Sequence, residues 1–288
     1  MSRRLEILSG ALRPSRRMRI ADVGANPLGE AAYRGLLDAG LCEVIGFEPQ
    51  PEAFARLQEA RGPAETYFET AVGAPARTEL HLHKRSGFVS LFPLDRNALR
   101  QIGKEFWCDN ARGTIPVAPR PLDEIEGLPR IDLLKMDLQG GELDVLTGGA
   151  DRLSEAVAIV TEVRFHRMYE GEPLFGDIDR QMRDMGFKLY KFLFTKSVMM
   201  PHEAEDQIHR PRMTSQLLDG DAVYLREGVL GEVLSDDQLM WLAMAADAML
   251  AAPDLCLHCL TALKTRGLAA RETIDAYVRA LPRKLKEK

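Results

Sequence analysis

A glycine turn and a carboxylate at the end of the next apolar run have types and spacing that suit ligand binding. The run MRIADVG ends at Gly24 and continues as ANPLGE, and Glu48 ends the following run. A strand, a tight turn and a helix N-terminus offer backbone N–H groups and the positive end of a helix dipole. A carboxylate at Glu48 can accept two hydrogen bonds from ribose hydroxyls. The pair predicts a nucleoside site; alternatively, Glu48 only starts a loop and caps the next helix.

The turn lacks residues that two phosphate-binding motifs need. Gly24 and Gly29 have the spacing of a P-loop, but the Lys and Ser/Thr that contact phosphate and metal are missing. Glu30 and Ala31 stand in their places. In a dinucleotide fingerprint the middle glycine lets the backbone approach the diphosphate, and here that residue is Asn26. We therefore predict a nucleoside ligand without phosphates.

The elements around this turn follow a regular alternation. Apolar segments of strand length alternate with helix-period segments from about 18 to 194, which is typical of a parallel sheet covered on both faces. Strands are expected at 18–24, 42–48, 66–72, 131–137, 156–162, 186–194 and 221–226, and helices at 29–39, 51–61 and 141–153. The segment 77–84 is expected as a strand that flanks the sheet. The long connection 195–220 suggests a lid or binding segment.

The end of the chain has a different composition. Helices are expected at 235–250, 254–265 and 271–282. We divide the chain into a lead (1–17), an α/β domain (18–228) and a C-terminal helical extension (229–288). An apolar stripe on the first of these helices is expected to pack on the α/β domain. Alternatively, the stripe forms a homodimer contact or covers a substrate site. It consists of Trp241, Leu242, Met244 and Leu250.

Composition and charge exclude several classes. The chain has 288 residues, 45% apolar and 28% charged, with a net charge of −5, so a broad cationic surface for nucleic acid is not expected. The N-terminus lacks the apolar core of a secretory signal, and no apolar run is long enough for a membrane span. Four cysteines in this context favour reduced thiols, so we expect a cytoplasmic protein. They are Cys42, Cys108, Cys256 and Cys259.

Two other segments contain residues that could bind a metal or a substrate. Cys256, His258 and Cys259 lie in one expected helix without a distant second pair of ligands, so core packing is expected rather than zinc binding. In the segment 195–220, Arg210 and Arg212 are candidates for contact with an acidic group of a substrate. A solvated loop is the alternative for these two arginines.

Three sequence blocks occur in a defined order. They are ADVGANPLGE (21–30), VIGFEPQPEAFARL (44–57) and IDLLKMDLQGGELDVLTGGADRL (131–153). Together they resemble the FkbM family of S-adenosylmethionine-dependent methyltransferases over about residues 18–226. The chain departs from the usual family pattern at two places. Pro27 and Leu28 stand where one residue is usual, and Gln139 stands where Glu is usual.

The resemblance implies a Rossmann-like class I methyltransferase fold. This is a seven-stranded, mostly parallel sheet with helices on both faces, in which 221–226 is the antiparallel strand. S-adenosylmethionine, the methyl donor, would lie across the carboxyl ends of the strands. Asp22 would face its ammonium and Glu48 its ribose. The other cofactor-binding residues expected are Gly24, Ala25, Asn26, Pro49, Val72, Gly73, Asp137 and Gln139.

Methyl transfer from a sulfonium mainly requires that donor and acceptor be aligned and that the acceptor lose its proton. The ends of the strands 131–137 and 156–162 place Asp137 and Glu162 beside the methyl group. Lys135 shares the face of Asp137. We expect either carboxylate or His166 to be the general base, with a surface histidine as the alternative for His166. The two carboxylates could also hold Mg²⁺, which we do not favour, and no metal ligand is assigned.

The residues after Asp137 bear on the acceptor. LQGG stands where amine methyltransferases carry an Asn/Asp-Pro-Pro-Tyr-like turn. The acceptor is therefore expected to be a hydroxyl on a sugar, a glycan or a secondary metabolite, and the family resemblance implies the same. A non-catalytic binding or scaffold module is the alternative, which Asp22, Glu48 and Asp137 disfavour. An NAD-linked oxidoreductase is disfavoured because Asn26 crowds the pyrophosphate.

Overall fold

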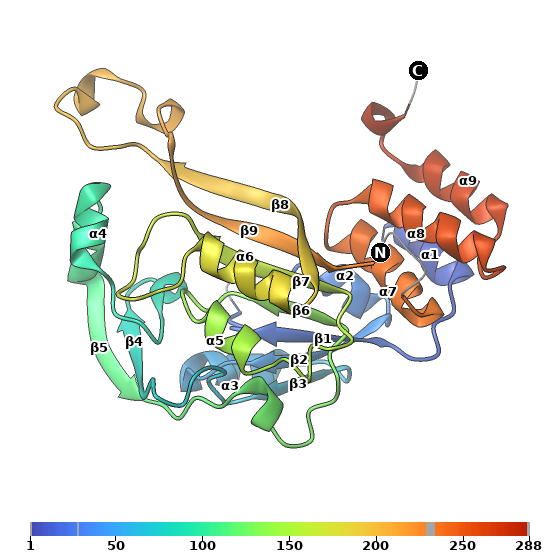
Figure 1. Ribbon diagram of the computed structural model, residues 1–288, viewed down its shortest axis with the longest axis horizontal. Coiled ribbons are helices and arrows are strands. Elements are labelled where there is room, and N and C mark those ends of the chain that lie inside the picture. The colour runs from blue at the N-terminus through green and yellow to red at the C-terminus, as the bar shows by residue number, and fades with distance from the viewer. Residues whose placement is uncertain (1, 28, 229–233, 287–288) are drawn as a thin grey trace.

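A seven-stranded sheet forms the centre of the protein (Figure 1). A computed structural model describes residues 2–27, 29–228 and 234–286. In spatial order the strands are β3 (Glu65–Phe68), β2 (Cys42–Phe47), β1 (Met18–Val23), β6 (Leu133–Met136), β7 (Ala158–Arg164), β9 (Gln216–Arg226) and β8 (Phe187–Val198). β9 runs antiparallel to both neighbours, and the other adjacent strands are parallel. The predicted mostly parallel sheet with 221–226 as its antiparallel strand is confirmed.

The central strands are almost continuous apolar runs because both faces of the sheet are covered. Ile20 and Leu133, which are opposite each other on β1 and β6, enter one buried cluster. Ala21 and Leu134, one residue further along each strand, enter the cluster on the other face. The register therefore sends neighbouring side chains into two separate cores.

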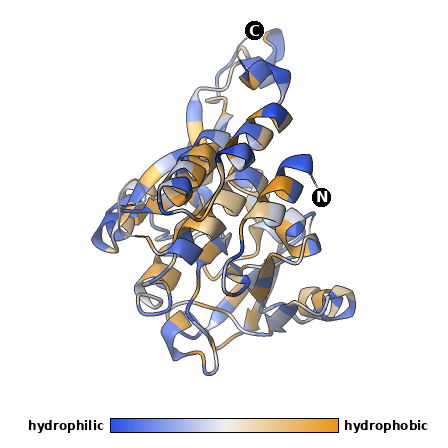
Figure 2. Cartoon of the chain, turned by 90° about the vertical axis from the view of Figure 1, so that its right-hand side faces the viewer, coloured by the Kyte–Doolittle hydropathy of each residue, from blue (hydrophilic) through white to orange (hydrophobic). Residues whose placement is uncertain are grey.

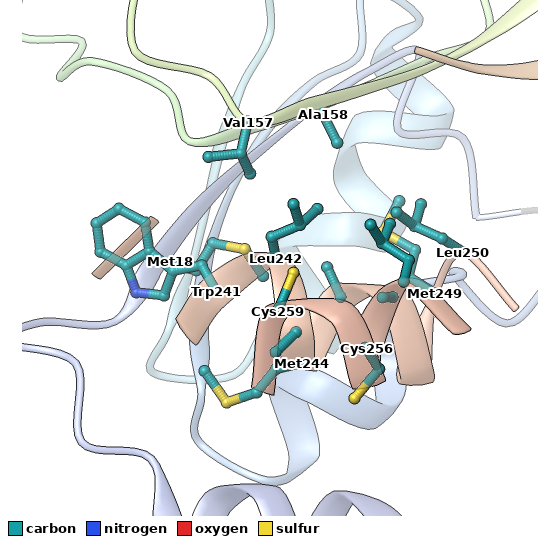
Figure 3. Close-up of a cluster of buried hydrophobic side chains, with 14 of the residues drawn as sticks. Met18, Val157, Ala158, Trp241, Leu242, Met244, Met249, Leu250, Cys256 and Cys259 are labelled. Carbon is teal, nitrogen blue, oxygen red and sulfur yellow. The ribbon is translucent and has the colours of Figure 1, made fainter. Parts of the chain in front are cut away.

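Helices from both ends of the chain cover one face. They are α1 (Arg3–Ala11), α2 (Arg34–Asp38), α7 (Asp236–Ala248), α8 (Pro253–Thr265) and α9 (Arg271–Ala280). Trp241, Leu242, Met244 and Leu250 are all buried in this cluster. Figure 3 shows Ala158, the first residue of β7, and Val157, which directly precedes it, above Leu242. The apolar stripe thus packs on the sheet, as predicted, and is not free for a homodimer contact. The boundaries after 17 and 228 stay a prediction, but the three segments share one core.

The cysteines of α8 belong to this core. Cys256 and Cys259 are completely buried, and Figure 3 shows both among the apolar side chains. Burial raises the pKa of Cys259 to about 12, so its thiol stays protonated. All four cysteines of the chain are free. The expectation of core packing is confirmed for this pair.

The opposite face is covered by α5 (Glu142–Thr147) and α6 (Phe175–Asp184). Val145 of α5 and Met182 of α6 are fully buried against it. α3 (Pro51–Ala60) contributes Leu57 to a smaller cluster beside β3. Helices therefore lie on both faces, as predicted.

Two expected helices are shorter than their patterns indicated. Instead of 29–39, α2 covers only Arg34–Asp38, since Tyr33 at its N-cap is held across the end of β1 by a bond from its hydroxyl to Asp22. Instead of 141–153, α5 ends at Thr147 because two glycines follow it. A side chain at Gly149 would press against Leu122. The expected third strand, 66–72, also ends early, at Phe68.

The hairpin of β8 and β9 extends past the other strands in Figure 1. It continues to Val198 and resumes at Gln216, so the connection expected at 195–220 shrinks to 199–215. Two short turns lie there, η4 (Glu205–Gln207) and η5 (Arg210–Arg212). The sequence did not predict the extra length of these two strands because it is rich in polar residues. Pairs such as Lys196 opposite Asp219 leave no alternation of apolar and polar residues.

A small second sheet stands at the end of the molecule opposite to α1 and α7–α9 (Figure 1). It pairs β4 (Glu79–His83) with β5 (Ala111–Pro116) in antiparallel orientation. A strand is present within the expected 77–84, but it belongs to this second sheet and does not flank the main sheet as expected, and its partner β5 was not predicted. Between them lie η1 (Ser86–Phe88), α4 (Arg96–Gln101) and η2 (Glu105–Asn110), and a further turn, η3 (Leu122–Glu124), precedes β6. The C-terminal helices are therefore remote from this small sheet.

Hydrophilic residues lie on the outer sides of the helices near both termini (Figure 2). Within the ranges that the structure describes, no helix combines the length and apolar character needed to cross a membrane. The last short turn, η6 (Arg283–Leu285), ends the described chain.

Candidate active site

A pocket opens at the carboxyl ends of β1, β2 and β6, where the sequence placed the site. Most of the predicted residues line it, namely Gly24, Asn26, Glu48, Pro49, Val72, Lys135, Asp137 and Gln139. The other five do not line it, namely Asp22, Ala25, Gly73, Glu162 and His166. The segment 86–91, which sequence reasoning did not assign, forms much of the remaining wall. It is polar and irregular, so no periodicity pointed to it.

The glycine turn needs a glycine at its first position. Gly24 has a φ of +83°, and an added Cβ would overlap the carbonyl oxygen of Asp137. The N–H groups of Gly24 and Ala25 both donate to the carbonyl of Phe47 at 3.0 Å, so neither is free for a ligand. Buried Oδ1 of Asn26 has no hydrogen-bond partner among the residues that the structure describes. An unpartnered buried acceptor fits a ligand that donates a hydrogen bond. The described residues do not include Leu28, so the wider turn expected at Pro27-Leu28 lies outside them.

Glu48 is buried, with 2% of its surface exposed, yet it lines the pocket. Its Oε1 accepts a bond of 2.8 Å from the backbone N–H of Gln50. Burial raises the pKa of Glu48 to about 7, although the bond from Gln50 acts against the rise. Hydroxyl donors from a ligand would favour the charged carboxylate. These properties fit a ribose with two adjacent hydroxyls.

Asp22 lies behind the pocket rather than in its wall. Its Oδ2 accepts a bond of 2.7 Å from the hydroxyl of Tyr33, and Oδ1 lies 3.0 Å from Nζ of Lys135. Burial disfavours the charge on Lys135, but Asp22 and Asp137 outweigh it and raise the pKa of Lys135 above its usual value. The cation that reaches the pocket is therefore Lys135, with Asp22 as its counter-ion.

Asp137 and Glu162 are joined by the side chain of Gln139. Its Nε2 donates to Oδ1 of Asp137 and to Oε2 of Glu162, both at 2.7 Å. An amide nitrogen thus lies between the two carboxylates that could have held a cation. Within the described ranges, no three His, Cys, Asp or Glu side chains form a group that could bind a metal ion.

Arg164 stands at the centre of a buried cluster behind Glu162. We define the Arg164 cluster as Arg164 with Glu162, Tyr169, Glu172 and Asp219. Nη1 lies 2.9 Å from Oε1 of Glu162 and 3.2 Å from Oδ2 of Asp219. Burial disfavours the charge on Arg164, but Glu162, Tyr169, Glu172 and Glu142 together outweigh it and raise the pKa of Arg164 above its usual value. Burial also raises the pKa of Glu162 well above its usual value. Sequence reasoning named only Glu162 here, because the residues from 164 to 172 show no periodic pattern and Asp219 comes from a distant strand.

Glu142 shapes the loop that carries Leu138 and Gln139. Its Oε1 accepts from the N–H of Leu138 at 2.8 Å, and Oε2 accepts from the N–H of Gly140 at 2.9 Å. Glu142 is buried in the first turn of α5. It therefore fixes the backbone between β6 and the helix, beyond the helix stabilisation that its position indicates.

His166 and the two loop arginines lie outside the pocket. Nε2 of His166 lies 2.9 Å from the carbonyl oxygen of Ala98, and its backbone N–H donates to Leu218. This places the imidazole against α4 rather than beside Asp137. Arg210 is paired with Glu205 and Asp206 of its own loop.

The sheet order and this pocket define a Rossmann-like class I methyltransferase fold. Residues 22–189 match the methyltransferase FkbM domain. The 2-O-methyltransferase NoeI of Sinorhizobium fredii (strain NBRC 101917 / NGR234) is 34% identical over 170 residues, which are 56% of this chain and 69% of NoeI. The chain belongs to the FkbM methyltransferase family. The predicted enzyme class, an S-adenosylmethionine-dependent O-methyltransferase, is confirmed.

Solved structures of methyltransferases are similar to the chain at low identity. Magnesium protoporphyrin IX methyltransferase (ChlM) from Synechocystis PCC 6803, with bound S-adenosylmethionine, is 11% identical with a TM-score of 0.39, over 78% of this chain and 76% of that one. Precorrin-6y C5,15-methyltransferase from Geobacter metallireducens GS-15 is 14% identical with a TM-score of 0.36, over 78% and 87%.

Proposed function

We propose that the chain transfers a methyl group from S-adenosylmethionine to a hydroxyl of a sugar or glycan. The observation that carries the proposal is that Glu48 and Asp137, from strands on either side of β1, line one pocket with the Gly24 turn between them. One carboxylate suits the donor's ribose, and the other suits an acceptor hydroxyl. A hydroxyl as the acceptor agrees with the name of the relative NoeI, which is a 2-O-methyltransferase.

The residues of the pocket fit S-adenosylmethionine. Glu48 would accept hydrogen bonds from the ribose hydroxyls, and Oδ1 of Asn26 would accept one from the methionine ammonium. Lys135 would attract the methionine carboxylate, because its charge reaches the pocket and Asp22 does not. Pro49 and Val72 would contact the adenine. When bound, the donor supplies a methyl group on a positively charged sulfur.

Asp137 is the residue that would take the acceptor's proton. It lines the pocket, whereas Glu162 is held in the Arg164 cluster and His166 lies against α4. A carboxylate that accepts the hydroxyl proton during methyl transfer acts as a general base, which contributes about 10²–10⁴-fold to a rate. Leu80, Val89 and Leu91 give the pocket an apolar wall that limits water near the reacting atoms.

Net charge, burial and hydrogen bonding bear on the partners, the compartment and the metal. A small-molecule or glycan acceptor is proposed rather than nucleic acid, because the net charge of −5 does not favour a polyanion. The apolar stripe of α7 is buried within the chain, so it supports no homodimer. Four free cysteines support a reducing compartment such as the cytoplasm. Mg²⁺ is not proposed, because the amide of Gln139 lies between the two candidate carboxylates.

Calorimetry and a turnover assay together test the proposal. S-adenosylmethionine should bind, and NAD should not. The wild-type protein should then form S-adenosylhomocysteine and a methylated product with an acceptor from a panel of deoxysugars, hexoses and oligosaccharides. Binding without turnover on any hydroxyl acceptor would favour the non-catalytic binding module. Binding of NAD instead of S-adenosylmethionine would end the methyltransferase proposal.

A further inference from the structure

Gln139 has a backbone conformation that a glycine would adopt more readily. Its φ is +57°, in the left-handed region, and among the described residues only Ala251 is another non-glycine there. A side chain in this region costs conformational energy, and such residues often occur at functional sites. The backbone alone would therefore favour glycine at 139, so the side chain must contribute something that offsets the cost.

The side chain of Gln139 makes every hydrogen bond that a primary amide can make. Both N–H groups are used, one on Asp137 and one on Glu162, each at 2.7 Å. Oε1 accepts from Nη2 of Arg164 at 2.7 Å and from the hydroxyl of Tyr169 at 3.0 Å. Two acceptors face its nitrogen and two donors face its oxygen, so the amide has one orientation. A glutamate here could not donate to either carboxylate.

The backbone of Gln139 is held as well. Its carbonyl oxygen accepts a bond of 2.7 Å from Oγ of Ser90, which lines the pocket in the segment 86–91. Glu142 holds the N–H groups on both sides of it. Gln139 thus connects the carboxylate that lines the pocket to the Arg164 cluster, to Ser90 and to the loop held by Glu142.

We propose that Gln139 is a positioning residue, whose amide holds the carboxylate of Asp137 against the Arg164 cluster and fixes the direction in which Asp137 accepts a proton. The inference rests on the proposed function, in which Asp137 is the base. The amide engages Oδ1, and no hydrogen bond recorded within the described ranges engages Oδ2. Oδ2 is therefore the oxygen available to an acceptor.

Asp137 is exposed toward the pocket, and titratable groups from several elements lie on its protein side. Lys135 with Asp22 lies toward β1, and Glu162 with Arg164 lies on β7. The remaining groups that face Asp137 or its neighbours are Glu142, Tyr169, Glu172, Lys196, Asp219 and Asp221. In Gln139→Glu a third carboxylate would stand between Asp137 and Glu162. Adjacent like charges raise the pKa values of carboxyl groups, so the proton on this cluster would be released at higher pH.

Two substitutions separate positioning from a purely structural turn. Gln139→Gly suits the backbone conformation and removes the amide with its four hydrogen bonds, so the gain in backbone conformational energy should offset part of the loss and leave the variant folded, as a thermal melt checks. Gln139→Glu keeps the size of the side chain but replaces the N–H donors with a carboxylate oxygen, which can only accept. Gln101→Glu, on the exposed end of α4, is the control for the added charge. S-adenosylhomocysteine affinity, measured by calorimetry, should stay within about threefold of wild type in Gln101→Glu, and its loss in the two Gln139 variants should be smaller than their loss in kcat.

The expected kinetic result is a loss in kcat. Gln139→Gly should lower kcat by roughly 30- to 100-fold, since a misplacement of about 1 Å can cost about 100-fold. Gln139→Glu should move the acidic limb of the pH–kcat profile upward by about one pH unit. Gln101→Glu should have the kcat and the pH–kcat profile of wild type. A folded Gln139→Gly variant with wild-type kcat would overturn the inference without touching the proposed function, which depends on wild-type turnover alone.

A second readout does not need an acceptor. Carboxyl ¹³C NMR titration, with the Asp137 signal assigned by its loss in Asp137→Asn, follows the same carboxylate in the ligand-free protein. Its midpoint should rise in Gln139→Glu by about one pH unit and stay at the wild-type value in Gln101→Glu. An Asp137 signal that titrates identically in wild type and Gln139→Glu would contradict the inference.

Discussion

The ammonium of Lys135 lies 3.0 Å from the buried carboxylate of Asp22, directly across the β1–β6 pair. Asp22 was expected to meet the ligand, but it does not line the pocket; its Oδ2 accepts from Tyr33, and its Oδ1 forms the ion pair with Lys135 without a recognised hydrogen bond among the described residues. The charge that faces the pocket is therefore positive at this point. The catalytic role expected for Lys135 and the cofactor contact expected for Asp22 both stay predictions.

Removal of Lys135 should weaken both the fold and donor binding. Lys135→Met leaves the carboxylate of Asp22 buried without its counter-ion, so the free energy of unfolding should fall by about 1–3 kcal/mol. Calorimetry should also show weaker S-adenosylmethionine binding, because the methionine carboxylate loses its cation. Lys188→Met is the matched control, since Lys188 is an exposed lysine paired with exposed Glu227. Urea unfolding that gave equal stabilities for the two variants would contradict this role of the ion pair.

Substitution by alanine should have a large effect at Gly24 and a small effect at Gly29. Gly24→Ala combines a left-handed backbone with overlap of the Asp137 carbonyl, so unfolding free energy should fall by more than about 1 kcal/mol, with loss of donor binding. At Gly29 an added Cβ meets open space among the described residues, so Gly29→Ala should bind S-adenosylmethionine as wild type does. Thermal melts and calorimetry on both variants check this. Equal melting temperatures and equal donor affinities in the two alanine variants would contradict the claim that the close approach of Gly24 to Asp137 requires a glycine.

Donor affinity should depend on pH through Glu48. Its pKa of about 7 in the free protein lies above the usual value, so the carboxylate is half protonated near neutral pH. Ribose hydroxyls donate to the charged form, so binding favours loss of the proton. The affinity for S-adenosylmethionine should therefore fall as the pH decreases below about 7, approaching about tenfold per pH unit.

Glu48→Gln supplies the comparison, because its amide does not titrate. The variant should bind more weakly at pH 8 and should lose most of the pH dependence between 5.5 and 8. Calorimetric dissociation constants at several pH values measure both effects. An unchanged slope in the variant would assign the titration to another group, such as Asp221, whose pKa burial raises to about 6.

Stability should depend on the C-terminal helices as much as on the sheet. Leu242 of α7 is fully buried in the cluster that includes β1 and β7, so Leu242→Ala should cost about 2–5 kcal/mol. Leu268→Ala, at a leucine that is 37% exposed, should change the unfolding free energy by less than about 0.5 kcal/mol. Calorimetric melting should show one transition in every variant. A separate transition for the helices would mean that they form an independent domain.

Much of the fold could be predicted because its signal is local. Runs such as 18–23 and 42–47 are apolar over the length of a strand, and Glu48 directly follows one of them. The antiparallel strand at 221–226 and the packing of the α7 stripe were also predicted. Those features depend on composition and periodicity within a short window.

The parts that the sequence did not reveal depend on contacts between distant segments. Arg164 meets Asp219 across two strands and Gln139 across a loop, and nothing in the local sequence indicates either contact. The segment 86–91 reaches the pocket without any periodic pattern. Asp22 has the expected position, but its partner Lys135 was assigned a catalytic role, because the pairing depends on the register of β1 and β6.

Transfer of a ¹³C-labelled methyl group from S-adenosylmethionine tests the central claim most directly. Wild-type protein should place the label on oxygen of a sugar acceptor, as an O-methyl signal in the ¹³C NMR spectrum of the product. Asp137→Asn should lower this rate by about 100-fold or more, whereas His166→Ala should lower it less than about threefold. Label found on nitrogen or carbon, or undiminished O-methyl transfer by Asp137→Asn, would contradict the account.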